Sequence, residues 1–530
     1  MTLDPTRSNS SAMTEPTTDP PGDLTADLTA GPPADPASRV SAGVSNGVSN
    51  GARGGASDAE RVIHEAAVLM AAAGLERPIL MVQQPAAVMP TTFRVDVAAA
   101  AAVGALTAAV AQLAGRRQAT RPLVATVNGR AAQISFRSER YLQIDGVAPA
   151  DPWGALSGDY RSLDGWIRVH ANFVHHAVAA ARAMGLAPEA GQAVERKALA
   201  AALAARPSRE AEAAILAAGG AAAAMRPWEE WVAHPHGAME RNGLPVRVEA
   251  LETTSPARSW PTAAPSTPPT PPRGLEGLRV LDLTRIIAGP VCGRVLSGHG
   301  ADVFAVTGQH LPQIDSLVID TGFGKRSCFL DLREPADRAS FEALVAGADA
   351  VVESYRPGAL AALGYSPQRL AELSPGLVIV DVRAYGSSGP WAPRRGFDSL
   401  VQMVSGIARA GQLAAAHDRP VPLPCQALDH ATGWLAAMGL VGAWCRQRQQ
   451  GGSWRVEVSL SATAAWFIGL GRVAGLEVTD PGLAEVADLR LETPSGFGLI
   501  GHVGLPGTIE GATVGWDSPP PALGSSPPRW

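Results

Sequence analysis

Short apolar runs alternate with helical segments over residues 274–386, and this alternation restricts the fold more than any other feature. The runs RVLDLT (279–284), ADVFAV (301–306), ADAVVESY (348–355) and GLVIVDVRAYG (376–386) have the length and composition of buried strands. FEALVAG (341–347) and SPQRLAEL (366–373) read as helices between strands. Because regular alternation favours parallel strands with helices on both faces, the sequence predicts an α/β fold with a doubly wound parallel sheet.

The glycines after the first predicted strand do not form a nucleotide-binding loop. Gly289, Gly293 and Gly298 lack the G-x-G-x-x-G spacing of dinucleotide-binding folds, and no P-loop lysine motif follows the strand. We therefore interpret them as positions where a helix packs closely on the sheet. A ligand is still expected in the crevice beyond the carboxyl ends of the strands.

Composition divides the 530 residues into five parts. Residues 1–57 are rich in Pro, Ser, Thr, Gly and Asp and are expected to be a disordered tail. Residues 58–252 are mostly helical in pattern, and the Pro-rich stretch 253–273 reads as an extended linker. The predicted sheet domain occupies 274–480 and is followed by a C-terminal extension, 481–530.

Charge and cysteine usage exclude several classes of partner and compartment. A net charge of −5 with interspersed signs gives no basic patch for nucleic acid. The most apolar run, residues 97–114, is dominated by alanine and is predicted to be a buried helix rather than a membrane span. The first residues have no apolar signal segment, and four scattered cysteines fit reduced thiols. We expect a cytoplasmic protein without a membrane or nucleic-acid partner.

Six stretches in a fixed order resemble the family III CoA-transferases, which include the formyl-CoA and carnitine-CoA transferases and the α-methylacyl-CoA racemases. They begin at residues 277, 324, 348, 375, 424 and 451 with GLRVLDLTRIIAGP, GKRSCFLDLREP, ADAVVESYRPG, PGLVIVDVRAYG, PCQALDHATGW and GGSWRVEVSLSATA. The resemblance implies a doubly wound sheet domain with a smaller, mostly helical α+β domain. It also implies an acyl-CoA:carboxylate CoA-transferase that works through an aspartyl-CoA thioester. Acyl-CoA and a carboxylic acid would be the substrates, no cofactor would be permanently bound, and a homodimer is expected.

Asp429 is the residue that the resemblance places at the catalytic position. Taken alone, an aspartate before an apolar helix is a typical N-cap, and its charge suits the positive end of the helix dipole. The run D-x-x-x-G, here Asp429 and Gly433, matches the family's nucleophile and the glycine after it. Capping and catalysis are compatible, because a helix start favours the anionic form that a nucleophile needs.

The resemblance also implies a set of CoA contacts. They are Ile287, Ala288, Lys325, Arg326, Leu330, Asp331, Leu332, Arg333, Ser354, Tyr355, Arg356, Arg383, Ala384, Tyr385 and Gly386. Their basic members suit phosphate groups, although any one of them could be a solvated surface charge. Ile287 replaces a glutamine of the family pattern and Ala362 replaces a common arginine, so the contacts would be arranged differently here.

Two other functions remain open. A racemase would use a histidine where this chain has Phe397, and a phenyl ring cannot carry a proton. His430 follows Asp429 directly and would point about 100° away from it on a helix. An inactive CoA-binding or partner subunit would explain the altered contact positions. The aromatic residues Trp391, Phe397 and Trp434 suggest an apolar acyl group, or they belong to the core.

The first half resembles a displaced part of the same family. Residues 164–186 and 208–237 resemble the C-terminal small domain of family members, which here precedes the sheet domain. Residues 96–132 echo 429–464, with Asp96 opposite Asp429. We hypothesise that the back half of one copy is fused to the front half of another, with Asp96 a relic or a helix cap. The histidines at 170, 175, 176, 234 and 236 lack ligand partners at metal spacing, and no metal site is expected.

Overall fold

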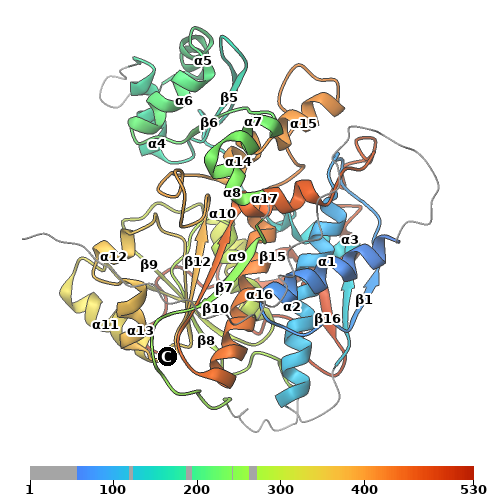
Figure 1. Cartoon of the computed structure of the whole chain (residues 1–530), viewed down its shortest axis with the longest axis vertical. Coiled ribbons are helices and arrows are strands. Elements are labelled where there is room, and N and C mark those ends of the chain that lie inside the picture. The colour runs from blue at the N-terminus through green and yellow to red at the C-terminus, as the bar shows by residue number, and fades with distance from the viewer. Residues whose placement is uncertain (1–56, 118–122, 187–193, 242, 262–270) are drawn as a thin grey trace, which may run out of the picture. The chain divides into compact units, whose positions relative to one another are not determined.

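A seven-stranded sheet organises the second half of the chain, in the order β10-β9-β8-β11-β12-β13-β7 (Figure 1). Its strands are β7 (Val246–Ala250), β8 (Arg279–Asp282), β9 (Asp302–Thr307), β10 (Lys325–Phe329), β11 (Ala350–Glu353), β12 (Val378–Arg383) and β13 (Trp454–Ser459). All pairings are parallel except that of β7 with β13. This arrangement confirms the predicted doubly wound sheet. Its switch point lies between β8 and β11, from which successive strands run in opposite directions across the sheet.

The computed structural model describes residues 57–117, 123–186, 194–241, 243–261 and 271–530. The predicted disordered tail, apart from its last residue, lies outside the described residues. All the elements below belong to the unit Ala56–Trp530.

Side chains alternate between two helical layers along the strands, as a doubly wound sheet requires. Val280, Val303 and Val352 belong to the core shared with α9 (Ala288–Gly298) and α16 (Ala427–Gln450). Leu281 and Phe304, each one residue further on, face the core on the opposite side of the sheet. That side is covered by α11 (Pro335–Ala346), α12 (Ala359–Ala362) and α13 (Pro367–Leu373), while α10 (Asp315–Thr321) connects β9 to β10.

The glycines of α9 permit close packing, as predicted. A Cβ on Gly289 would lie 2.3 Å from Cβ of Thr284, and one on Gly293 would lie 2.6 Å from Oδ2 of Asp282. The first turn of α9 therefore rests directly on the carboxyl end of β8.

A smaller sheet has the same strand arrangement as the β12-β13-β7 edge of the large sheet. In it β1 (Leu80–Gln83) pairs in parallel with β2 (Ala125–Asn128), and β16 (Gly507–Ile509) lies antiparallel to β2. The strands β12, β13 and β7 have the same relationship. The helix α2 (Val95–Arg117) precedes β2 in the chain, as α16 precedes β13. Each of these strands is followed by a helix with an N-terminal side-chain cap, α3 (Gly129–Ser135) after β2 and α17 (Leu460–Gly469) after β13. This correspondence supports the hypothesised repeat.

The first half also contains a separate α+β layer. The strands β4 (Gly158–Arg161), β5 (Trp166–Val169) and β6 (Ala222–Ala224) form an antiparallel sheet, and their core includes residues of α4 (Val174–Ala183), α5 (Arg196–Ala204) and α6 (Ser208–Ala217). The strand, turn and helix predicted for 164–186 are present as β5 and α4. The helices α7 (Trp228–Ala233) and α8 (Pro235–Glu240) then lead towards β7, and α1 (Asp58–Ala72) packs on α2.

Strands from each half of the chain pair with strands from the other half, across the predicted domain boundaries. β7 precedes the predicted linker but pairs with β13, and β16 lies in the predicted C-terminal extension but pairs with β2. The hairpin of β14 (Arg490–Ser495) and β15 (Gly498–Val503) adds the short strand β3 (Gln143–Ile144). Residues 253–261 and 271–273 of the linker form no helix or strand, and 262–270 lie outside the described residues.

Helix α2 contains the apolar run that was predicted to be buried. It is long and apolar enough to cross a membrane by length and composition, but its apolar window is completely buried inside the protein. It packs against α1, α3 and α16. The predicted buried helix at 97–114 is therefore confirmed.

Candidate active site

Asp429 stands in the first turn of α16, but another aspartate caps this helix. The N-cap residue Gln426 makes no side-chain capping bond. Instead, Oδ2 of Asp398 accepts the N–H groups of Leu428 at 2.8 Å and Asp429 at 3.0 Å. Asp398 begins α14 (Asp398–Val404) and is 2% exposed. Because Asp398 satisfies the orphan N–H groups, the side chain of Asp429 is not needed as a cap.

The carboxylate of Asp429 accepts no hydrogen bond from any group in the described part of the chain. Burial, followed by the charges of Asp398 and Glu139, raises the pKa of Asp429 well above its ordinary value. Burial also raises the pKa of Asp398 to about 6, although the N–H groups that it accepts oppose this shift. This shift favours the protonated acid, contrary to the expectation that the helix start favours the anion. Once ionised, a carboxylate without hydrogen-bond donors has its electron pairs available for attack on an electrophile.

Glu139 reaches this site from the first half of the chain. It belongs to the 3-10 helix η1 (Ser138–Arg140), and its Oε2 lies 3.1 Å from Nε2 of His430. Burial alone would raise the pKa of Glu139, but the hydrogen bond and charge of His430 outweigh burial and lower it. Glu139 is therefore an ionised group near Asp429. His430 points to Glu139 and lines neither of the cavities at Asp429, in agreement with the predicted helical offset.

Gly433 explains the spacing of the D-x-x-x-G run. A Cβ at this position would lie 2.5 Å from the carbonyl oxygen of Ala288 and 2.8 Å from Cβ of Val291. Only glycine lets α16 approach the first turn of α9 this closely. Gly433 lies one helical turn after Asp429, so this contact brings the Asp429 carboxylate to the N-terminus of α9.

Two cavities meet at Asp429. The first, of about 430 Å³, lies at the switch point and includes residues that follow β8, β11 and β12. We call it the arginine cavity because it contains Arg285, Arg356, Arg383, Arg394 and Arg395. The second, of about 290 Å³, is lined mainly by apolar side chains, and we call it the apolar cavity.

Three guanidinium groups of the arginine cavity have no carboxylate partner among the described residues. Arg285 donates to the carbonyl of Pro312, Arg395 donates to the carbonyl of Gly219, and Arg356 is exposed. Burial and then the charge of Arg356 lower the pKa of Arg395. Such a concentration of unneutralised positive charge suits a polyanion such as the phosphates of CoA.

The other two arginines of this cavity are already paired. Arg383 donates to Glu353 and, at 2.8 Å, to Asp381. Arg394 donates to Glu212 at 2.6 Å. Their charges are neutralised within the protein, and their contribution is to hold the walls of the cavity.

The structure brings together seven of the fifteen predicted CoA contacts in the arginine cavity. They are Ile287, Ala288, Ser354, Tyr355, Arg356, Arg383 and Ala384. Leu330 and Asp331 lie around another, more open hollow with His310. Leu332, Arg333, Tyr385 and Gly386 line none of these cavities; Arg333 pairs with its neighbour Asp331, and Tyr385 is 1% exposed.

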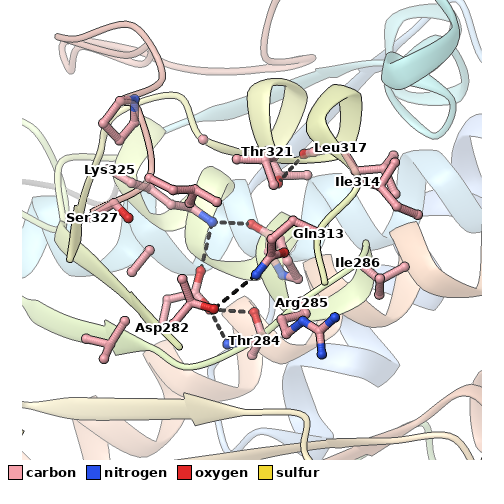
Figure 2. Close-up of a pocket in the computed structure, with 18 residues that line it drawn as sticks. Asp282, Thr284, Arg285, Ile286, Gln313, Ile314, Leu317, Thr321, Lys325 and Ser327 are labelled. Carbon is pink, nitrogen blue, oxygen red and sulfur yellow. Dashed lines mark hydrogen bonds and ion pairs between the residues drawn. The ribbon is translucent and has the colours of Figure 1, made fainter. Parts of the chain in front are cut away.

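The remaining predicted basic contacts are engaged elsewhere. Lys325 lines a small neighbouring cavity of about 60 Å³, where its Nζ donates to Asp282 and to the carbonyl of Pro290, each at 2.8 Å (Figure 2). Figure 2 shows this ammonium group pointing at Asp282. Arg326 pairs with Asp302 at 2.7 Å.

Ile286 separates the three cavities, because its side chain lines each of them. Its φ is +79°, a conformation that β-branched residues rarely adopt. Backbone strain of this kind persists only where surrounding contacts enforce it, and it concentrates at functional sites.

Phe397 occupies the wall between the arginine and apolar cavities, where a racemase would need a histidine. It stacks on His170, with ring centroids 3.6 Å apart. Burial, then the charges of His176 and Arg168, lowers the pKa of His170 to about 3, so this imidazole is neutral. Trp391 and Trp434 line neither cavity at Asp429: Trp391 packs on Trp231, and Trp434 is 2% exposed.

Several cavity residues were not singled out from the sequence. Three of them, Arg285, Arg394 and Arg395, lie in the part of the chain that the resemblance covers. Basic residues in the loops that follow strands could have predicted a phosphate site there. Glu139, Trp153 and His170 come from the first half, and only their distant pairing in the fold reveals them. No group of three or more His, Cys, Asp or Glu side chains that could hold a metal occurs within the described ranges.

Comparison with known proteins identifies part of the chain. Residues 275–474 match the family described as CoA-transferase family III. An acetyl-coenzyme A transferase of Hypoxylon pulicicidum is 33% identical over 45% of this chain and 41% of the relative. A probable fatty acyl-CoA transferase of Mycobacterium tuberculosis is 30% identical over 38% of this chain and 52% of the relative.

A succinyl-CoA–D-citramalate CoA-transferase of Chloroflexus aurantiacus is 34% identical over 35% of this chain and 48% of its own length. The chain thus spans about half the length of the curated relatives it matches. A solved Mycobacterium tuberculosis protein is 28% identical over 38% of this chain and 57% of its own, with a TM-score of 0.35. A Brucella suis protein titled as CAIB/BAIF family is 25% identical over 37% and 55%, with a TM-score of 0.34. The part of the chain that matches CoA-transferase family III, residues 275–474, contains the parallel sheet and Asp429.

Proposed function

We propose that the protein is an acyl-CoA:carboxylate CoA-transferase with Asp429 as its nucleophile. The observation that carries this proposal is the position of the Asp429 carboxylate. It has no hydrogen-bond donor within the described residues, and it lies where the arginine cavity meets the apolar cavity. The relatives named as CoA-transferases support the same chemistry.

The proposed reaction uses two successive exchanges at Asp429. Its carboxylate attacks the thioester carbonyl carbon, the C–S bond breaks, and CoA leaves as a thiolate, which gives a mixed anhydride of Asp429 and the donor acid. The thiolate then attacks the Asp429 carbonyl carbon and releases the donor acid, which leaves an aspartyl-CoA thioester. The acceptor carboxylate attacks this thioester and again expels the CoA thiolate. The thiolate finally attacks the acceptor's acyl carbon, which forms the new acyl-CoA and restores Asp429.

The surrounding residues supply position and charge for these steps. Phosphates of CoA would contact Arg285, Arg356 and Arg395, so that the thioester points towards Asp429. The N-terminus of α9, at Ala288 and Gly289, lies in the same cavity and has no side-chain cap. Its N–H groups would stabilise the oxyanion that forms on the attacked carbonyl.

Trapping of the thioester tests the proposal. The protein is incubated with an acyl-CoA, treated with hydroxylamine, and analysed by peptide mass spectrometry. A hydroxamate at Asp429 is expected in the wild type and in Asp96→Asn, a matched change at the corresponding aspartate. Asp429→Asn should show neither the adduct nor CoA transfer. A folded wild-type protein that binds CoA but forms no adduct would instead be the inactive CoA-binding subunit.

We further propose that one chain holds a complete catalytic unit. Glu139, Trp153 and His170 from the first half line the apolar cavity together with Asp429. The expected homodimer would then join two complete units, and light scattering combined with activity at low protein concentration would test this. A cytoplasmic location is proposed from Cys292, Cys328, Cys425 and Cys445, all buried and unpaired, and fractionation of cells would test it.

A further inference from the structure

The side chains that line the apolar cavity differ from those of the arginine cavity, and they should determine which acid the proposed transferase accepts. It shares Ile286, Ile287, Phe397 and Asp429 with the arginine cavity. A CoA thioester held in the arginine cavity with its carbonyl at Asp429 would therefore place its acyl group in the apolar cavity. An acceptor acid attacking Asp429 would occupy the same space.

The lining of this cavity is mostly hydrocarbon. The apolar side chains are those of Leu142, Ala148, Pro149, Ala150, Pro152, Trp153, Ile286, Ile287, Ile314, Leu317 and Phe397. Burial of an apolar substrate group against them would be favourable by roughly 25 cal/mol per Å².

One wall of the cavity is flat and aromatic. His170 stacks on Phe397 with centroids 3.6 Å apart, and Trp153 meets His170 edge-on at 5.8 Å. His170 is neutral, because burial and neighbouring positive charges lower its pKa to about 3. This wall therefore offers ring faces and edges to a planar group, which aromatic side chains prefer to contact in offset or edge-to-face geometry.

The charges of the cavity oppose a second carboxylate on the substrate. Besides Asp429, the cavity contains Glu139, Asp398 and Asp151. Its single basic residue is Arg140, whose side chain is 40% exposed and lies 4.0 Å from Glu139. Arg140 is the one cation among the described lining residues, and the acids Glu139, Asp398 and Asp151 oppose its attraction for a distal carboxylate. Placing such a charge here would require its desolvation beside like charges.

We infer that the acid handled at Asp429 is an apolar monocarboxylate with a planar or aromatic body, and that short dicarboxylates are poor substrates. A dry cavity of roughly 150 Å³ holds a benzene molecule. The space of about 290 Å³ accommodates an aryl ring with a short chain. This inference rests on the proposed function and names the substrate class of the same site.

The test compares acceptor acids with one common acyl-CoA donor. Cinnamate and phenylacetate are measured against succinate and oxalate. We expect kcat/KM to be at least about tenfold higher for the aromatic acids, the effect of about 1.4 kcal/mol. Equal or higher kcat/KM for the dicarboxylates would overturn the inference while leaving CoA transfer at Asp429 intact.

Two variants at the rim sharpen the comparison. Trp153→Ala should lower the ratio of kcat/KM for the aromatic acids to kcat/KM for acetate about tenfold. Leu413→Ala, an apolar truncation at an exposed position outside both cavities, is the matched control. Ala150→Arg adds a cation at an exposed lining position and should raise the rate with succinate. Unchanged selectivity in both rim variants would contradict the inference.

A binding measurement separates failure of the inference from failure of the proposed function. If no acid is converted, calorimetric titration of the CoA-loaded protein with cinnamate and succinate still compares the two classes. Tighter binding of cinnamate, weakened by Trp153→Ala, would support the inference without catalysis. Tighter binding of succinate, or binding of neither acid, would reject it.

Discussion

The carboxylate of Asp398 accepts the backbone N–H of Asp429 at 3.0 Å, so one buried acid holds the helix on which another buried acid stands. Asp398 therefore caps α16, and the side chain of Asp429 on the same helix turn is not used as a cap. The two charges also repel, and burial together with Asp398 and then Glu139 raises the pKa of Asp429.

Replacement of Asp398 by asparagine should therefore change the pH dependence of the reaction. Asp398→Asn keeps an oxygen acceptor for the N–H groups but removes a charge beside Asp429. The pKa of Asp429 should fall, so the acidic limb of the kcat/KM profile should move to lower pH. Asp418→Asn, at an exposed position, provides the control for loss of one surface charge. A profile that stays in place in Asp398→Asn would show that Asp429 does not control this limb.

Removal of the Asp429 charge should stabilise the fold at alkaline pH. A carboxyl whose folded-state pKa is raised costs stability as the pH rises above its unfolded-state pKa, reaches its full cost above the folded-state pKa, and costs nothing in acid, where both states are protonated. Asp429→Asn should thus melt about 1–2 °C above the wild type at pH 8 and at the same temperature near pH 4. Scanning calorimetry at both pH values measures the difference. A variant that is less stable at pH 8 would mean that the ionised carboxylate has a stabilising partner.

The sheet could be predicted, and Asp429 could be proposed as the nucleophile, because both inferences depend on local order in the sequence. Strand-length apolar runs fix a parallel sheet, and the stretch around Asp429 keeps the family's spacing. The capping role of Asp398 was not predicted, since its partner lies 31 residues further along the chain. The place of Glu139 in the site could not be predicted for the same reason, because 291 residues separate it from His430.

The exchange of strands between the halves could not be predicted either. β7 is a five-residue strand with an unremarkable sequence, and its place beside β13 is set by packing across the chain. The predicted set of CoA contacts mixed free and neutralised cations, because sequence cannot show whether an arginine meets a carboxylate. Arg383 is held by two acids, whereas Arg356 has no acidic partner within the described residues and lines the cavity.

Loss of Arg356 should weaken CoA binding. A charge-assisted hydrogen bond to a phosphate contributes about 1.5–3 kcal/mol, so Arg356→Ala should raise the KM for acyl-CoA at least about tenfold. The kcat should change little, since Arg356 would contact the cofactor part of the substrate. Arg369→Ala, a surface arginine paired with Glu372 outside the arginine cavity, is the control. A salt titration of KM should be steeper in the wild type than in Arg356→Ala, and equal slopes would contradict a phosphate contact.

Addition of one methyl group at Gly433 should impair both packing and activity. In Gly433→Ala the new Cβ meets the carbonyl oxygen of Ala288, a backbone atom that cannot rotate away. The helix α16 must shift from α9, at a cost of about 1–3 kcal/mol in the free energy of unfolding. The shift also moves Asp429 from the N–H groups of α9, so kcat should fall at least about tenfold while the KM for acyl-CoA changes little. Gly469→Ala, at a helical position with open space around it, should leave the melting temperature and kcat unchanged. Unaltered kcat in Gly433→Ala would show that the reaction does not depend on the contact between these two helices.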